Sequence, residues 1–554
     1  TSGSNNVAIG QDALAQTTTA DFNTAIGRNA LQLPDTETHN LAIGFNAMSG
    51  AIAGGEYNVA IGNSTLDALT SGDNNVAIGD QAGSAITTGG QNVLIGRVAG
   101  NALTDGPWNV GVGYGAMRYA TTGDYNVALG GAALGGAALT GDRNIGIGYT
   151  AGAALTSGSD NTFIGYEAGD SHDAETNNMG IGRAALGGSI AGGENNVAVG
   201  NYSLDALTSG DYNTTLGYNA GSALTTGVRN VIIGSNAADA MVQGSSNVII
   251  GDEAVGGGVF TSSKLVAIGR NAGHDLTSAN NTTLVGYEAG QNITTGAGNI
   301  AIGSNSLDLC DTESNNLAIG VDAMHGSING GEFNVAIGNA TLDALTSGDG
   351  NTILGYNAGS SITTGGANTL IGHQAGQDTV ALTTGGNNVA IGLNVRTSAS
   401  DSYNAIVIGH NISAGSDFFA FGKASNVVSN NFTANASWSR SSDERKKTNI
   451  KNSTLGLNFI NELRPITFNW KPNSEFPETF EDYKQENQMT TDITLHGMIA
   501  QDVKKALDNA NVNDFGGWSE NEDGSQELSQ EMFVHPLIKA VQELSATVTT
   551  LQQE

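Results

Sequence analysis

A glycine recurs at nearly constant spacing through most of this chain, and that spacing limits the possible folds more than any other feature. From Gly10 to Gly422 there are 25 such glycines. Their step is about 17 residues until the spacing becomes irregular near the end. The phrase Asn-Val-Ala-Ile-Gly ends at several of them, first over residues 6–10. A short period kept over so many copies is typical of a solenoid, in which each repeat forms one coil stacked on the last.

Each repeat contains a short segment that alternates like a β-strand. Val59 and Ile61 lie two residues apart and share one face, while Ala60 faces the other way. The glycine that follows permits a tight bend, and the second half of the repeat adds apolar residues before a polar turn. One coil is therefore predicted to be a strand, a corner, a short apolar segment and a turn. The repeat asparagines are expected to stack in a ladder.

A second, longer period is superimposed on the first. Residues 35–73, 173–211 and 311–349 are near copies of one another, and each begins eight short repeats after the one before. This pattern indicates growth by duplication of blocks of eight coils. Stacked strands lie about 4.8 Å apart, so the 24 steps between the first and last glycine predict a shaft on the order of 115 Å long.

Composition disfavours several classes of protein. The 554 residues carry a net charge of −32, which argues against nucleic acid as a partner. The single cysteine, Cys310, excludes an intrachain disulfide and is expected to be a small buried side chain. No apolar run is long enough for a membrane span, so no membrane insertion is expected. Thr1 opens directly into repeat sequence, which indicates a processed or truncated chain or export without a signal.

No cofactor or metal site is predicted. The glycine-rich residues 111–115 lack the strand, loop and long helix of a phosphate site. The paired glycines lack the Gly-x-Asp spacing of calcium-binding β-rolls, so turn aspartates such as Asp73 are interpreted as solvated, with weak cation binding as the alternative. Aromatic residues beside the repeat asparagine, such as Tyr57 and Tyr125, are expected on the outside, either contacting a sugar or packed on the next coil.

So short a coil encloses little volume, and its Ala and Gly residues leave faces that a second chain can approach closely. We therefore expect a homo-oligomer, and three rolls around one axis would bury these faces. The phrase Asn-x-Val-Ala-Ile-Gly resembles the left-handed parallel β-roll heads of trimeric autotransporter adhesins, although the period is longer here. The variants over residues 165–169 and 355–359 resemble the shafts of phage tail fibres.

The composition changes at Ser441-Ser442-Asp443-Glu444-Arg445-Lys446-Lys447. Residues 1–441 hold 11 of the 21 basic and 34 of the 53 acidic residues, whereas the shorter stretch 442–554 holds 10 and 19. Basic residues are thus several-fold denser after the change. Four of the six prolines also follow it. The change in composition predicts a domain boundary at these residues.

Three segments are predicted. The repeat shaft covers residues 1–425, a neck or linker covers 426–441, and a second domain covers 442–554. Aromatic residues over 418–422, together with Trp438, are expected to plug the end of the narrow roll, because the last coil of a solenoid needs a cover.

After residue 442 the apolar period changes from 2 to about 3.6. We predict short helices over 455–463 and 503–509, a strand over 466–470, and a last helix from His535 to the C-terminus. Apolar residues in the last helix recur at spacings of 3 and 4, the heptad pattern of a coiled coil, which suits a trimer or a dimer. They are Val534, Leu537, Val541, Leu544, Val548 and Leu551.

Four blocks of this second domain, in order, resemble the intramolecular chaperone domain of phage tailspikes and fibres, also called peptidase family S74. The blocks are Ser442–Ile450, Leu463–Lys471, His496–Val503 and Lys539–Leu544. The resemblance implies a small α+β domain that trimerises the chains, templates the β-fibre and then cleaves itself off at Ser442. Ser-Asp before basic residues is by itself a common helix-cap pattern, and it is the further blocks that favour cleavage.

The candidate catalytic residues are Ser442, Lys447 and Asp443. A serine hydroxyl that attacks a peptide bond needs a base, and Lys447, five residues on, can supply one where burial removes its charge. Asp443 is expected to orient the lysine or to assist proton transfer. The resemblance places the cut between Ser442 and Asp443, while local geometry also allows attack on the carbonyl of Ser441. His496 either joins this site or packs within a strand.

Taken together, these features predict a phage tail fibre: a mainly β, homotrimeric parallel β-solenoid shaft, followed by the chaperone domain and its coiled-coil helix. Whether cleavage occurs stays open; any catalysis would be one intramolecular cut without turnover of external substrates. Expected partners are two further copies, other tail proteins and a host receptor, glycan or protein, with the fibre in the virion. A trimeric adhesin at the bacterial surface would share the shaft and add a membrane anchor. A capsule depolymerase would need clustered acids in a groove.

Overall fold

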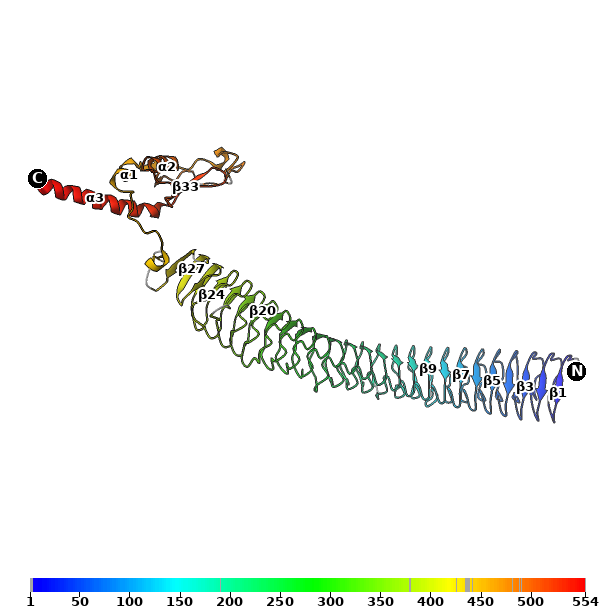
Figure 1. Ribbon diagram of the computed structural model, residues 1–554. Coiled ribbons are helices and arrows are strands. Elements are labelled where there is room, and N and C mark those ends of the chain that lie inside the picture. Colours follow the sequence, from blue (N-terminus) through cyan, green and yellow to red (C-terminus); the bar gives the residue numbers. More distant parts are fainter. Residues whose placement is uncertain are drawn as a thin grey trace. The chain divides into compact units, whose positions relative to one another are not determined.

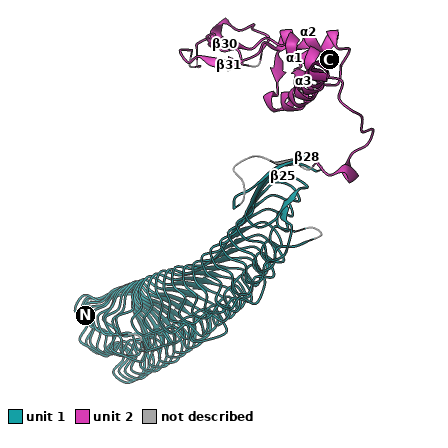
Figure 2. Cartoon of the chain, turned by 90° about the vertical axis from the view of Figure 1, so that its left-hand side faces the viewer, with its two compact units in different colours: residues 1–441 teal, residues 442–554 magenta. Residues whose placement is uncertain are grey.

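The computed structural model describes residues 3–553 except 190, 378–379, 425, 434–438, 441, 481, 488 and 490. The chain divides into two compact units, residues 1–441 and residues 442–554 (Figure 2). The first is a parallel β-solenoid, and the second is a small α+β unit that ends in a helix. The predicted fold class is therefore confirmed for the single chain.

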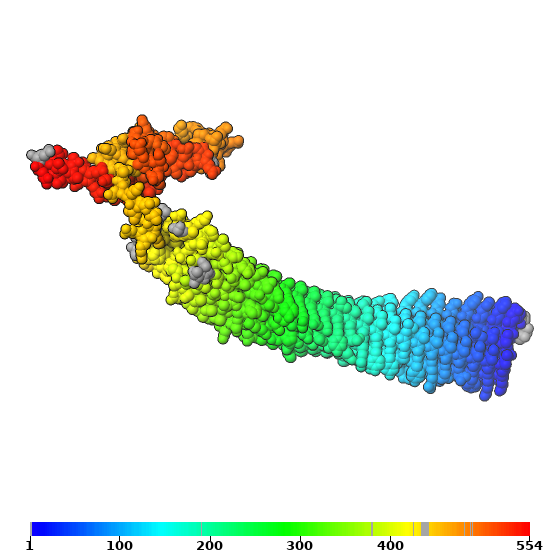
Figure 3. All heavy atoms as spheres, viewed as in Figure 1, coloured from blue at the N-terminus to red at the C-terminus, as the bar shows by residue number. Residues whose placement is uncertain are grey.

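Each of the first 23 coils contributes one three-residue strand to the main sheet, which has 27 strands among the described residues (Figure 1). Neighbouring strands pair in parallel with like residues side by side, so that Val59 lies beside Val76 and Ile61 beside Ile78. Figure 3 shows the coils of this unit stacked into one continuous, curved shaft. The coil strands are β1 (Val7–Ile9), β2 (Thr24–Ile26), β3 (Leu41–Ile43), β4 (Val59–Ile61), β5 (Val76–Ile78), β6 (Val93–Ile95), β7 (Val110–Val112), β8 (Val127–Leu129), β9 (Ile145–Ile147), β10 (Thr162–Ile164), β11 (Met179–Ile181), β12 (Val197–Val199), β13 (Thr214–Leu216), β14 (Val231–Ile233), β15 (Val248–Ile250), β16 (Val266–Ile268), β17 (Thr283–Val285), β18 (Ile300–Ile302), β19 (Leu317–Ile319), β20 (Val335–Ile337), β21 (Thr352–Leu354), β22 (Thr369–Ile371) and β23 (Val389–Ile391).

The middle residue of each strand faces the interior of the coil. Ala60 is fully buried, whereas Val59 and Ile61 on either side of it remain partly exposed. Leucines of the corner, such as Leu66 and Leu69, fill the rest of the core. The predicted alternation is confirmed, and the structure adds that the middle residue points inward. It is alanine in many coils, but Phe163 and Ile232 are fully buried in the same position.

The recurring glycine is required by the close approach of successive coils. Gly62 has a φ of 138°, a conformation that residues with a side chain rarely adopt. A Cβ added there would lie 2.5 Å from the carbonyl oxygen of Gly79 in the next coil. The same conflict arises coil after coil, which explains why the glycine spacing is so regular.

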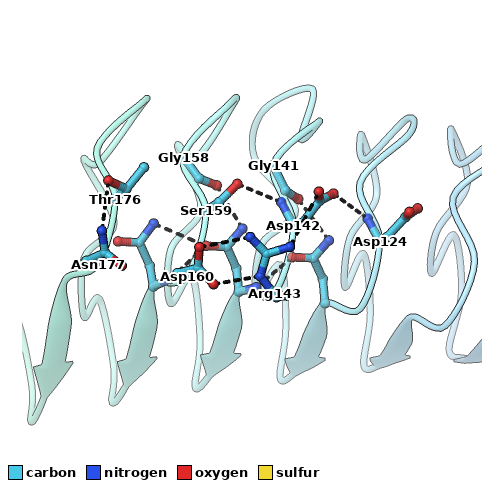
Figure 4. A network of polar contacts seen from close by, with 12 residues as sticks. Asp124, Gly141, Asp142, Arg143, Gly158, Ser159, Asp160, Thr176 and Asn177 are labelled. Atoms are coloured by element: carbon cyan, nitrogen blue, oxygen red, sulfur yellow. Dashed lines mark hydrogen bonds and ion pairs between the residues drawn. The ribbon is translucent and has the colours of Figure 1, made fainter.

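The predicted asparagine ladder is present and buried. Asn126 donates from Nδ2 to the carbonyl of Gly141 at 3.0 Å, and its Oδ1 accepts from the backbone N–H of Asn144 at 2.8 Å. Figure 4 shows the acceptor glycine at this turn, beside the exposed ion pair of Arg143 with Asp160. Because an unpaired buried polar group costs about 1–3 kcal/mol, each ladder asparagine holds two coils together.

A buried glutamate marks the same place in each copy of the eight-coil block. The carboxylate of Glu37 accepts from the backbone N–H of Gly54 at 2.8 Å. Glu175 does the same with Gly192 at 2.9 Å. In the third copy Glu313 accepts from the N–H of Gly330, also at 2.9 Å. All three side chains are buried, so the duplication seen in the sequence reappears as a repeated contact between coils.

The shaft ends in irregular strands and an antiparallel hairpin. Strands β24 (Arg396–Thr397) and β26 (Ser413–Ala414) pair with each other, while β25 (Ile406–His410) and β27 (Phe418–Lys423) continue the main sheet. β28 (Asn426–Asn431) then pairs antiparallel with β27, and β29 (Ser439–Arg440) pairs with β28. Part of the expected neck thus belongs to the sheet of the shaft.

Of the expected aromatic plug at this end, Phe418 packs against the core of the shaft. Ala420 occupies the interior position of β27, as alanine does in the coils, while Phe421 is exposed. The hairpin made with β28 covers the last coil instead, because it satisfies the backbone groups of β27. Trp438 lies outside the described residues.

The second unit is built on a small apolar core of Leu455, Phe459, Val503, Ala506, Leu507 and Phe533. Both predicted short helices, the predicted strand and the last helix are present; the hairpin formed by two strands after residue 517 was not predicted. The elements are η1 (Glu444–Lys446), α1 (Leu457–Glu462), β30 (Ile466–Phe468), η2 (Asn473–Glu475), β31 (Leu495–Gly497), α2 (Ala500–Asn509), β32 (Trp518–Glu520), β33 (Gln526–Leu528), η3 (Gln530–Phe533) and α3 (Val534–Gln553).

His172 occupies a position of the shaft core that is leucine in the preceding coil, Leu155. Its ring lies 4.7 Å from that of Phe163, and among the described residues neither ring nitrogen has a hydrogen-bond partner. Burial lowers the pKa of His172 to about 3. The folded shaft therefore holds this imidazole in its neutral form.

Replacing this histidine should make the shaft less sensitive to acid. In the unfolded chain His172 binds a proton near pH 6.5, whereas in the folded shaft it does so only near pH 3. This histidine therefore leaves the free energy of unfolding unchanged above pH 6.5 and lowers it as the pH falls towards 3. Between pH 7 and pH 4 the loss amounts to about 3 kcal/mol. We expect His172→Leu to reduce the fall in melting temperature between these two pH values, as measured by circular dichroism. An equal fall in the variant and the wild type would contradict this assignment.

Candidate functional site

A single turn of 3₁₀-helix brings Ser442 and Lys447 into contact. The backbone N–H of Lys446 donates to the carbonyl of Asp443 at 3.1 Å, and that of Lys447 donates to Glu444 at 2.9 Å. This tight turn, η1, reverses the chain within five residues. As a result Lys447 Nζ lies 2.7 Å from Ser442 Oγ and donates to it. The proposed nucleophile and base are thus within hydrogen-bonding distance.

Asp443 is held by Arg445 and not by the lysine. Its Oδ1 accepts from the backbone N–H of Arg445 at 2.9 Å, which caps η1, and its Oδ2 lies 2.6 Å from the arginine Nη2. The hydrogen bonds from the Arg445 side chain, followed by the one from its backbone, lower the pKa of Asp443. Among the contacts of the described residues Asp443 makes none with Lys447, so in this chain it shapes the turn.

The serine and the lysine are both exposed in the single chain. An exposed ammonium group is well hydrated, and here it donates a hydrogen bond to the serine hydroxyl. The geometry of a serine–lysine pair is therefore assembled in one chain, whereas the dry surroundings that would make the lysine a base are not supplied by that chain.

The pair lies where the two compact units meet in the sequence. The second unit begins at Ser442, the residue after the first unit ends. Of the residues predicted to flank the cut, Ser442 and Asp443 are the first two of this unit, and Ser441 lies outside the described residues. A cut at either bond flanking Ser442 would separate the shaft from the second unit.

His496 is exposed in the middle of β31, opposite Thr467 of β30. The expectation that it packs in its strand is therefore wrong. The two-stranded sheet leaves one face open to solvent, and the side chain lies there. No contact between described residues links His496 to Ser442 or Lys447.

Two contacts within the second unit were not predicted from the sequence. Arg464 Nη2 lies 2.8 Å from Asp502 Oδ2 and so joins two of the four sequence blocks. The carboxylate of Glu543, in α3, accepts from the backbone N–H of Leu457 at the start of α1 at 2.7 Å. This bond lowers the pKa of Glu543. The opposite charges of Arg464 and Asp502 were the feature of the sequence from which the first contact could have been predicted. Both contacts join segments of the second unit that are distant in the sequence.

α3 presents an apolar stripe that the single chain does not cover. The six heptad residues named above are between 44% and 66% exposed, from Val548 to Leu551. Ala540 on the same helix is buried against the unit. A long helix with one apolar stripe exposed is suited to pairing with like helices in a coiled coil.

Other kinds of site find little support in the described part of the chain. It contains no group of three or more His, Cys, Asp or Glu residues arranged to hold a metal ion. The turn residue Asp73 accepts from the backbone N–H of Glu56 in the preceding coil at 2.8 Å, so it bonds coil to coil. Cys310 is buried, and burial raises the pKa of its thiol. No helix among these residues is long and apolar enough to cross a membrane.

Comparison with known proteins supports the identity of the second unit. Residues 442–512 match the family model described as chaperone of endosialidase, peptidase S74. No match to the chain was found among curated proteins or among solved structures. The chaperone domain and a β-solenoid shaft of short, regular repeats fit a tail fibre with a C-terminal chaperone.

Proposed function

We propose that this tail-fibre-like chain is the shaft of a phage tail fibre whose C-terminal domain assembles three chains and then cuts itself off at Ser442. The contact of 2.7 Å between Lys447 Nζ and Ser442 Oγ carries the proposal. It brings a serine hydroxyl and a lysine amine together at the first residue of a domain that matches a chaperone family, which supports the roles of nucleophile and base. The proposal places the fibre in the virion, with other tail proteins and a host glycan or protein receptor as partners.

The chemistry is an acyl transfer to the serine hydroxyl followed by hydrolysis. Uncharged Lys447 takes the proton of Ser442 Oγ while the oxygen attacks a neighbouring carbonyl carbon. The C–N bond breaks, the nitrogen leaves as an amine after gaining a proton, and an ester remains. Water then hydrolyses the ester. Attack on the carbonyl of Ser441 closes a five-membered ring, whereas the family resemblance places the cut after Ser442.

Assembly would supply what the single chain lacks. The exposed stripe of α3 is suited to a three-stranded coiled coil. Neighbouring chains packed around η1 would exclude water from Lys447 and favour its uncharged form. Cleavage would then follow assembly, so that the domain leaves only after it has aligned the chains.

The intact mass of the purified wild-type protein tests the proposal. We expect two fragments whose masses add up to that of the chain plus one water. The two possible cuts differ by one serine residue, so the same spectrum identifies the bond. An uncut chain in an assembled trimer would exclude self-cleavage.

A further inference from the structure

The shaft carries a mainly apolar strip on its outer strand face, with threonine at the first position of six strands. In each coil every second residue around the strand faces outward, which gives four outward positions. In one coil they are Tyr125, Val127, Leu129 and Gly131. The first we name the leading column, two residues before the strand. The last we name the trailing column, two residues after it. Between them run the first and third residues of β1 to β23, which form the strip.

This strip is too large and too regular to belong on an isolated chain. Its Val, Ile and Leu side chains remain partly exposed from coil to coil, reaching 48% at Leu216 and 59% at Ile9 in the first coil. Soluble monomers rarely expose contiguous apolar patches larger than a few hundred Å². The aromatic residues of the flanking columns, such as Tyr57 and Tyr125, are also exposed.

The spacing of the strip identifies what covers it. Its rows repeat every ~4.8 Å, the distance between stacked strands, over the whole shaft. A partner must present side chains at that same spacing over the same length. A second copy of this chain meets the requirement at every coil.

We propose that the strips of parallel copies face one another, with the leading column of each chain against the trailing column of the next at the same height. This inference rests on the proposed trimeric fibre. A rotation about an axis parallel to the shaft leaves every coil at its height and brings one edge of the strip to the opposite edge of the neighbour. An antiparallel two-fold pair would instead bring leading column to leading column.

Residues at equal heights fit this pairing. Tyr125 in the leading column of one chain meets Gly131 in the trailing column of the next, and this glycine has no side chain. At the height of β21 the glycine is in the leading column and the tyrosine in the trailing column, as Gly350 and Tyr356. Other levels pair rings with rings or with a cation; they are Trp108 with Tyr114, Tyr212 with Tyr218, Phe22 with Arg28, and Arg143 with Tyr149.

Like charges meet at one of these levels within the described coils, where Lys264 faces Arg270. There Arg270 is already paired with Asp252 of its own chain, at 3.7 Å. The repulsion across the interface is therefore partly compensated, and this level does not oppose the arrangement.

Disulfide trapping in the full-length chain tests the register. The double variant Tyr125→Cys with Gly131→Cys places thiols in both columns at one height. Within one chain the two positions lie on either side of the strand β8, whose three residues alone span about 10 Å, which is too far for a disulfide. A Cβ at position 131 would meet the Tyr149 ring at 3.2 Å, a side chain that can move. Cys310 is buried and does not compete.

Oxidation should give covalent trimers on a non-reducing denaturing gel, with at least tenfold more cross-linking than in a matched control. The control pairs Tyr125→Cys with Tyr166→Cys, which belongs to the trailing column two coils away. Light scattering separates the two proposals. A trimer that does not cross-link through positions 125 and 131, or that cross-links equally well through the control pair, would overturn this register alone. A monomer would overturn the trimeric fibre as well.

Discussion

Chains carrying Ser442→Ala are expected to migrate as one full-length species on a denaturing gel, where the wild type yields two fragments. Loss of the hydroxyl removes the atom that would form the ester, so cleavage should slow by about 10³-fold or more. The turn that contains the site should persist, because its cap comes from Asp443 and Arg445. Fragments appearing at the wild-type rate in this variant would exclude Ser442 as the nucleophile.

Further variants separate chemistry from folding. Lys447→Met should block cleavage as fully as the serine change, whereas Lys451→Met, five residues beyond the end of η1, should cleave normally. Asp443→Asn distinguishes two roles. If Asp443 only caps the turn, the asparagine should retain much of the cleavage with an unchanged pH profile, since asparagine is also a good cap. A shifted pH profile would instead give the carboxylate a part in proton transfer.

Residues 1–441 produced without the second unit are expected to be monomeric or aggregated, in place of a soluble trimer. The isolated shaft keeps its exposed apolar strip and has nothing to align three chains in one register. Size-exclusion chromatography with light scattering measures the outcome. A native, soluble trimer from this fragment would refute the chaperone role of residues 442–554.

A smaller change tests the same function within the full chain. Leu544→Asp places a charge on the exposed stripe of α3 and should reduce the trimer yield at least tenfold. Gln542→Asp, on the same helix but off the heptad, is the matched control and should assemble normally. Equal assembly of the two variants would show that α3 is not the contact between chains.

The solenoid could be predicted because its constraints are local and repeat. The glycine period reports a backbone conflict between adjacent coils, as at Gly62, and this conflict leaves a mark in every repeat. The alternation of Val59, Ala60 and Ile61 predicted two faces but not which one is inside. The interior position is the middle one, and it accepts alanine in many coils but also Phe163 and Ile232, so side-chain size alone does not identify the inner face.

Errors arose where the repeat stops. Phe421 was expected in a plug because bulky apolar residues are usually buried, but the alternation of β27 continued and put Ala420 inside. The hairpin of β32 and β33 was not predicted, because its strands are mostly polar. In short segments the pairing partner decides the structure more than the composition does.

The candidate site was predictable in part. The five-residue spacing of Ser442 and Lys447 suggested a contact, and the structure shows their side chains 2.7 Å apart. The partner of Asp443 could not be read from the sequence, because Arg445 and Lys447 are both cations within four residues of it. The cap geometry of the turn decides for Arg445, whose planar guanidinium reaches the carboxylate while its backbone N–H is also bonded to it.

The buried glutamates of the eight-coil blocks suggest how the length of the shaft can change during evolution. Glu37, Glu175 and Glu313 make the same contact, so the coil entering one block is equivalent to the coil entering the next. Recombination between two copies of the gene can therefore remove or insert a whole block of eight coils, and the contacts between coils at each junction stay the same. The length of the shaft would then change in steps of about 38 Å, while residues 442–554 stay unchanged.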